Sequence, residues 1–315
     1  GNTLIGGQAG DSLTTGGFNT VVGKSALSTE DAHGYCTAVG YQALLTQDAG
    51  SNAANTAVGF DAGGDITTGT NNTLMGHESG NALTTGSHNV AIGYGTLDAE
   101  DAHGRNVAIG YQALTNQDAG ADAYNVAIGF YAGKNLTDGI ENTIIGGNAA
   151  DGLTTAKECT LIGANTAAGG IVTGNQNTSL GRYTLYNLTS GIGNTAIGSQ
   201  AMINGVVTAD YNTAVGKDAG ASITSGSHNV LIGTYAGDSL SSGERNTAVG
   251  NYALSSEDGD GYNTALGYAA LLTQNAGATA YNVAVGYNAG QAITTGVTNV
   301  IMGGNAGLAL TSGSD

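Results

Sequence analysis

The sequence predicts an all-β protein, a single-chain parallel β-solenoid of about 18 turns of 17–19 residues. One motif recurs along the whole chain: Asn, then Thr or Val, a variable residue, an aliphatic residue or Met, and Gly. Glycine accounts for 55 of the 315 residues and proline is absent, while 40% of the residues are hydrophobic. A constant period with this mixture of apolar and turn residues is typical of a stacked repeat protein.

The motif defines the turns and their lengths. The spacing is 17 residues, except for 19 after Cys36, Asn106 and Asn263 and 18 after Cys159 and Asn194. The extra residues fall between motifs, so the sequence predicts one continuous repeat domain over residues 1–315. The turns begin at Asn2, Asn19, Cys36, Asn55, Asn72, Asn89, Asn106, Asn125, Asn142, Cys159, Asn177, Asn194, Asn212, Asn229, Asn246, Asn263, Asn282 and Asn299.

Each turn is expected to hold two short strands and two corners. Positions two and four of a turn share one face of a strand, because side chains alternate along it. They are apolar or β-branched in every turn, so we expect Val58, Val107 and Ile109 to point into the core. A second apolar set at positions eight and twelve, such as Ala43 and Leu83, completes the predicted core.

Positions one and five carry structural residues. Asn occupies position one in all but two turns, and we expect Asn55, Asn106 and their equivalents to form a ladder that bonds turn to turn. Position five is always Gly, which indicates a tight bend or a close approach of two backbones. Representative glycines are Gly59, Gly110, Gly198 and Gly250.

Position three points away from the predicted core, yet its volume varies with that of position six. Leu4 is paired with Gly7, whereas Ala57 is paired with Phe60. Because a solvated face has no reason to compensate volume, this pattern indicates that the outer face is packed. We therefore expect a homo-oligomer.

The repeats resemble those of known fibre proteins. The run NTAVG at 55–59, with NVAIG at 106–110 and NTAIG at 194–198, resembles the repeat of trimeric autotransporter adhesin heads. The longer run NVAIGYQAL at 106–114 is similar to repeats of phage tail-fibre proteins. The resemblance implies a left-handed β-roll, three chains around one axis, attachment to cell surfaces, and a location outside the cell or on the virion surface.

Composition excludes several classes of function. Seven Lys and Arg against 24 Asp and Glu give a net charge of −17, which repels nucleic acid and anionic membranes. No segment approaches the roughly 20 apolar residues of a membrane helix, so we expect no membrane insertion. No turn carries an insertion long enough to wall a catalytic cleft around two carboxylates, and we expect no enzyme activity.

Three long corners carry clustered carboxylates. Such clusters can hold calcium, although solvated corners that keep a fibre soluble are the simpler interpretation. We expect no cofactor, with calcium as the alternative; the weak metal candidates are Glu30, Asp31, Glu100, Asp101, Glu257, Asp258 and Asp260. The five histidines show no metal-ligand spacing and are expected to be exposed at corners: His33, His77, His88, His103 and His228.

Cys36 and Cys159 replace the asparagine of position one. They stand seven turns apart, far beyond the roughly 7 Å Cα separation that a disulfide tolerates. We therefore expect two buried free thiols.

These features favour a structural and adhesive extracellular fibre segment, a tail-fibre or adhesin shaft. A self-assembling filament with end-to-end contacts is the main alternative. Repeated Thr pairs, such as Thr67 with Thr68 and Thr84 with Thr85, leave an ice-binding solenoid as a minor one. A cell-surface receptor or glycan partner cannot be identified from the repeats.

Overall fold

The structure is a computed structural model that describes residues 1–100, 102–259, 261–277 and 279–314. Strands and turns make up these residues, and no helix long and apolar enough to cross a bilayer occurs among them. The chain divides into two compact units, Gly1–Glu158 and Cys159–Asp315.

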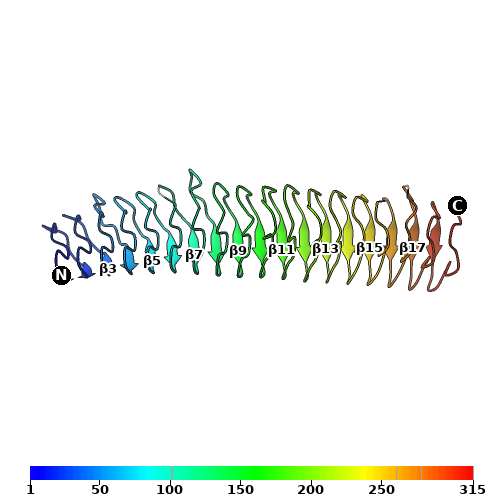
Figure 1. The fold of residues 1–315 in the computed structure, drawn as a ribbon, viewed down its shortest axis with the longest axis horizontal. Helices are drawn as coiled ribbons and strands as arrows, with labels where there is room; N and C mark the ends of the chain where they lie inside the picture. The colour runs from blue at the N-terminus through cyan, green and yellow to red at the C-terminus, as the bar shows by residue number, and fades with distance from the viewer. Residues whose placement is uncertain (101, 260, 278, 315) are drawn as a thin grey trace. The chain divides into compact units, whose positions relative to one another are not determined.

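The first unit is a stack of nine turns, each with one three-residue strand (Figure 1). Every strand pairs in parallel with the next, and equivalent motif positions face each other: Thr56 pairs with Thr73 and Ala57 with Leu74. The strands are β1 (Thr3–Ile5), β2 (Thr20–Val22), β3 (Thr37–Val39), β4 (Thr56–Val58), β5 (Thr73–Met75), β6 (Val90–Ile92), β7 (Val107–Ile109), β8 (Val126–Ile128) and β9 (Thr143–Ile145).

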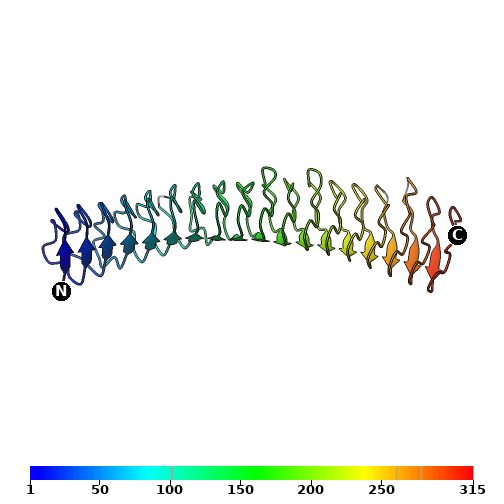
Figure 2. The same cartoon turned by 60° about the horizontal axis from the view of Figure 1, so that its bottom comes forward.

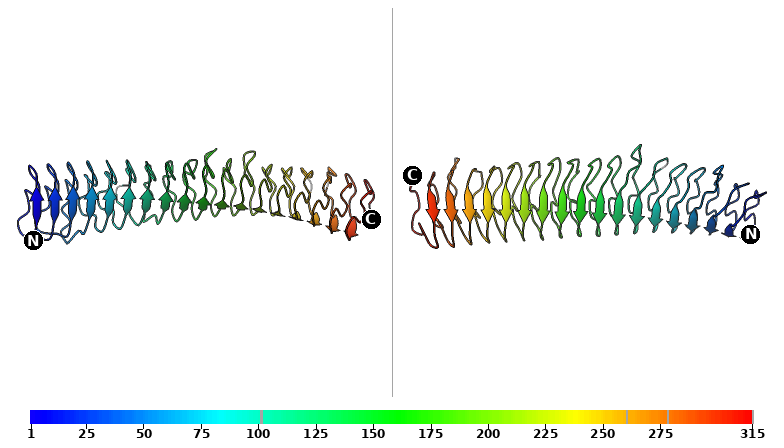
Figure 3. Two further views of the ribbon diagram at one scale, coloured as in Figure 1. Left: turned by 90° about the horizontal axis from the view of Figure 1, so that it is seen from below. Right: turned by 180° about the vertical axis from the view of Figure 1, so that it is seen from behind.

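The second unit repeats this arrangement with nine more strands. Figures 2 and 3 show that within each unit the strands form one row and the loops of the turns lie on the other side of it. The strands are β10 (Thr160–Ile162), β11 (Thr178–Leu180), β12 (Thr195–Ile197), β13 (Thr213–Val215), β14 (Val230–Ile232), β15 (Thr247–Val249), β16 (Thr264–Leu266), β17 (Val283–Val285) and β18 (Val300–Met302).

The parallel β-solenoid predicted from the repeat is confirmed within each unit. Each turn has one strand rather than the two expected. Among the described residues, the β-pairing outside the named strands is one isolated parallel bridge, between Leu188 and Val207.

The predicted orientation of the strands is wrong. Ala57 and Ala108, at position three, are completely buried, whereas Val58, Val107 and Ile109, at positions two and four, are only half-buried. The alternation was correct, but alternation alone does not say which face is inside. The interior of so short a turn is narrow, so position three is Ala in most turns and is Leu or Ile only where another inward position is small.

The volume compensation belongs to positions three and nine, both of which point into this interior. In all six turns with Leu or Ile at position three, position nine is Gly or Ala. A Cβ atom added to Gly63 or Gly80 would lie 2.6 or 2.8 Å from a methyl group of Leu74. The expected trade between positions three and six has no packing basis, because Phe60 at position six points to solvent.

The remaining core positions lie as expected. Ala43, at position eight, and Leu83, at position twelve, are completely buried. Close approach at position five is also confirmed: Gly110 has a φ of 131°, and a Cβ atom there would lie 2.3 Å from the carbonyl oxygen of Gly129 in the next turn. No other residue type fits at that separation.

The asparagine ladder is confirmed. The backbone N–H of Asn72 donates to Oδ1 of Asn55 in the preceding turn (2.8 Å), and Nδ2 of Asn72 donates to the carbonyl of Gly86 (2.9 Å). Each such side chain therefore joins two turns and closes its own turn 14 residues later. Asn55, Asn106 and most of their equivalents are completely or almost completely buried.

Turns of 19 residues break the second of these bonds. The Nδ2 atoms of Asn106 and Asn263 are buried without a hydrogen-bond partner, and both residues begin 19-residue turns. The third such turn begins with Cys36, whose backbone N–H still donates to Oδ1 of Asn19 (2.9 Å). In this 19-residue turn a thiol therefore stands where an asparagine would have an unpaired amide nitrogen, as in the turns of Asn106 and Asn263.

The reversed orientation can be tested with a pair of neighbouring substitutions. Ala108→Asp should lower the free energy of unfolding by about 3 kcal/mol or more, because it buries an unpaired charge. In the separate, unassociated chain Ile109→Asp should cost less than about 1 kcal/mol, because its side chain reaches solvent there. Chemical denaturation in dilute solution measures both, and the opposite order would restore the orientation expected from the sequence.

The ladder predicts unequal costs for one substitution at two equivalent positions. Asn72→Cys leaves the carbonyl of Gly86 and the N–H of Asn89 without their hydrogen-bond partner. Asn106→Cys leaves only the N–H of Asn125 without its partner, and it removes an amide nitrogen that had none. We expect Asn72→Cys to be the more destabilising by about 2 kcal/mol. Equal melting temperatures of the two variants would contradict this account of the ladder.

Candidate functional site

The outward face of the strands is apolar. We name as the outward ribbon the side chains at positions two and four of β2–β9, which are half-buried or exposed. They carry no charge. The ribbon consists of Thr20, Val22, Thr37, Val39, Thr56, Val58, Thr73, Met75, Val90, Ile92, Val107, Ile109, Val126, Ile128, Thr143 and Ile145.

Aromatic rings from position six extend the apolar surface. Six consecutive turns place rings one above the other, with centroids 4.9–5.3 Å apart and interplanar angles of 9–21°. The Lys24 ammonium lies 5.9 Å from the first ring centroid. This aromatic row consists of Tyr41, Phe60, His77, Tyr94, Tyr111 and Phe130, all exposed.

The first long corner brings together three carboxylates and an imidazole. Glu30, Asp31, His33 and Asp48 each offer a ligand atom, and these atoms lie within 4.8 Å of one another. Glu30 is completely buried, and its Oε1 accepts a hydrogen bond from the backbone N–H of His33 (2.9 Å). Asp48 comes from the following turn, so the cluster spans two consecutive turns.

The second corner has the same arrangement. Glu100, His103 and Asp118 offer ligand atoms within 4.8 Å of one another, and Glu100 is completely buried. The backbone N–H of His103 donates to Oε1 of Glu100 (3.1 Å). The predicted candidate Asp101 lies outside the described residues.

The third corner, in the second unit, differs in composition. Glu257 is buried and Asp258 is exposed, whereas Asp260 lies outside the described residues. Asn275 stands where the other corners have Asp48 and Asp118. Among the described residues, no group of three potential metal ligands forms here.

The histidines fall into two groups. His77, His88 and His228 are exposed, as expected. The imidazoles of His33 and His103 are only 28% and 29% exposed. Sequence spacing missed them as ligands because their partners Asp48 and Asp118 come from the next turn.

A buried glutamine follows each buried glutamate at position twelve of the next turn. Nε2 of Gln47 donates to the carbonyl of Thr67 (2.8 Å), and Gln117 makes the same bond to Thr137 (2.8 Å). The sequence could have revealed these glutamines, because position twelve is Leu or Ile in many other turns.

Both cysteines are buried free thiols, as predicted. Burial raises the pKa of the Cys36 thiol to about 11, with a smaller contribution from the nearby Glu30 carboxylate. This thiol is therefore a weak nucleophile and a poor metal ligand at neutral pH.

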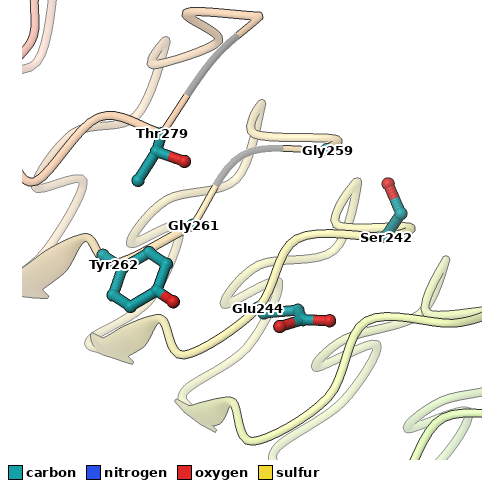
Figure 4. Close-up of a pocket in the computed structure, with 6 residues that line it drawn as sticks. All are labelled: Ser242, Glu244, Gly259, Gly261, Tyr262 and Thr279. Atoms are coloured by element: carbon teal, nitrogen blue, oxygen red, sulfur yellow. The ribbon is translucent and has the colours of Figure 1, made fainter.

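A small cavity of about 210 Å³ lies at the third corner (Figure 4). Its lining groups include the hydroxyl groups of Ser242 and Thr279, the Glu244 carboxylate and the Tyr262 ring. The Glu244 carboxylate pairs with the Arg245 guanidinium at 3.2 Å, so its charge is already partly compensated. Gly259 and Gly261 also line this cavity.

The threonine pairs use their hydroxyl groups within the fold. Oγ1 of Thr14 donates to the carbonyl of Asp31 (3.0 Å), and Oγ1 of Thr67 donates to that of Thr84 (3.1 Å). Oγ1 of Thr294 bonds Thr311 in the same way. These hydroxyl groups brace neighbouring turns, so the structure adds no support to an ice-binding role for the pairs.

Comparisons with family models, with curated proteins and with solved structures found no match.

The raised pKa of Cys36 predicts a loss of stability at high pH. The thiol ionises from about pH 9 in the unfolded chain but only near pH 11 in the folded one, so folding resists ionisation in this window. Between pH 9 and 11 the parent should lose roughly 2 kcal/mol more unfolding free energy than Cys36→Ala. If denaturant titrations gave the same change of unfolding free energy with pH for both proteins, the raised pKa of Cys36 would be contradicted.

Proposed function

We propose that the chain is a structural and adhesive extracellular fibre segment, a shaft whose copies associate side by side through the outward ribbon. The observation that carries this proposal is the long, uncharged apolar face of the strands. In this proposal the chain contributes shape and contact rather than catalysis, and its location is the cell or virion exterior.

The size of the face supports a partner. Eight turns at about 4.8 Å and five residues at about 3.3 Å give the ribbon and aromatic row roughly 600 Å² in the first unit. Monomeric proteins rarely expose a continuous apolar patch larger than a few hundred Å², and such patches mark interaction surfaces. The same positions are half-buried or exposed along β10–β18 of the second unit.

Charge favours a second copy as the occupant of this face. The chain carries −17, so two copies repel each other wherever their corners meet. The ribbon has no charged residue, and association through it removes apolar surface from water at the lowest electrostatic cost. Identical repeats in each copy also offer identical spacing along the contact.

The number of copies is a further part of the proposal. Three chains are what the resemblance to adhesin heads and tail fibres implies, and we propose a trimer. Its contact face is positions two and four, rather than the position-three face expected from the sequence.

Light scattering of the purified chain tests the proposal. We expect a mass near three times 30.9 kDa for the parent and a shift to 30.9 kDa for the double variant Ile109→Glu/Ile128→Glu. The matched control is Thr68→Glu/Thr85→Glu, which adds the same charge at exposed corner positions and should stay associated. A monomeric parent, or equal masses for both variants, would overturn the proposal.

A further inference from the structure

We propose that the two histidine corners of the first unit each bind a divalent transition-metal ion of the zinc type. The ligands are Glu30, Asp31, His33 and Asp48 in one corner and Glu100, His103 and Asp118 in the other. This inference does not depend on the proposed fibre function.

The ligand atoms are close enough together to share one ion. In a tetrahedral zinc site the ligand atoms lie about 3.4 Å from one another, given bonds of about 2.1 Å. In the first corner Nδ1 of His33 lies 3.4 Å from Oε1 of Glu30, and all four ligand atoms lie within 4.8 Å of one another. In the second corner, Nδ1 of His103 lies 3.5 Å from Oε1 of Glu100.

The imidazoles supply an observation independent of the carboxylates. Nδ1 of His33 and Nδ1 of His103 are both buried atoms without a hydrogen-bond partner, and each is aimed at the glutamate oxygen of its corner. Buried nitrogen atoms of this kind are almost always satisfied by a hydrogen bond or a metal. The same unpaired nitrogen atom occurs at the equivalent position of two separate turns.

The buried Glu30 carboxylate is a second reason to expect a cation in the first corner. It is completely buried, and no Lys or Arg among the described residues lies within ion-pair distance of it. Its oxygen atoms meet the backbone N–H groups of His33 (2.9 Å) and Ala49 (3.4 Å), the second of which is a long contact. Buried carboxylates are normally paired with a cation or coordinate a metal.

The ligand type selects the metal. Calcium prefers six to eight oxygen atoms, whereas an imidazole with two or three carboxylates suits zinc and its neighbours among the transition metals. Because each of these two corners contains a histidine, zinc fits them better than the calcium ion considered from the sequence. Bound there, the ion would tie Glu30 and His33 to Asp48 of the following turn.

The third corner provides an internal control. The residue three positions after Glu257 is Asp260 rather than histidine, and Asn275 replaces the aspartate of the next turn. A corner without an imidazole lacks the ligand that favours zinc. We expect the third corner not to contribute to zinc binding.

Isothermal titration of the chelator-treated full chain with zinc chloride tests the proposal. We expect two zinc ions per chain, one after His33→Gln, one after His103→Gln and none after the double variant. Glu257→Gln, in the third corner, should leave the stoichiometry at two. Circular dichroism of each variant checks that it is folded, and the two single variants keep the test valid if the double variant does not fold.

The proposal would be overturned by the absence of zinc binding by the folded parent, by binding by the double variant equal to that of the parent, or by tighter binding of calcium than of zinc. Binding that disappears after His77→Gln, His88→Gln or His228→Gln would place the ion at exposed histidines and would also overturn it.

Discussion

The buried asparagine at position one is the interaction on which the rest of the structure depends. Its Nδ2 closes the turn on a carbonyl 14 residues later, as Asn72 does with Gly86, and this reach sets the period of 17 residues. In the 18-residue turn of Asn194 the acceptor moves to Ala209, 15 residues later. In the 19-residue turn of Asn106 no acceptor is found for this atom. Turn length and amide bonding therefore change together.

A closed turn of this size leaves a narrow interior, and this space determines the surface. Leu and Ile occur at position three only where position nine is Gly or Ala, and Ala108 is paired with Leu114. Positions two and four are left on the outside, where they form the outward ribbon. The apolar face that we propose for association is a consequence of how little the core can hold.

Features that repeat locally could be predicted from the sequence, whereas features that depend on the third dimension could not. The period, the asparagine ladder and the close approach at Gly110 follow from residue identities at fixed positions. The inward face did not follow, because alternation is symmetric between the two faces; the compensation between positions three and nine was the signal that could have decided it. The histidine corners were missed because His33 and Asp48 meet only when one turn is stacked on the next.

Hydrogen exchange of the backbone amides at position one tests the ladder most directly. The account predicts that the N–H groups of interior asparagines, such as Asn72 and Asn89, exchange only through global unfolding, because each is buried and donates to the asparagine before it. Amides of the exposed corners should exchange orders of magnitude faster. Equal exchange rates for the two sets would contradict the claim that the asparagine ladder organises the solenoid.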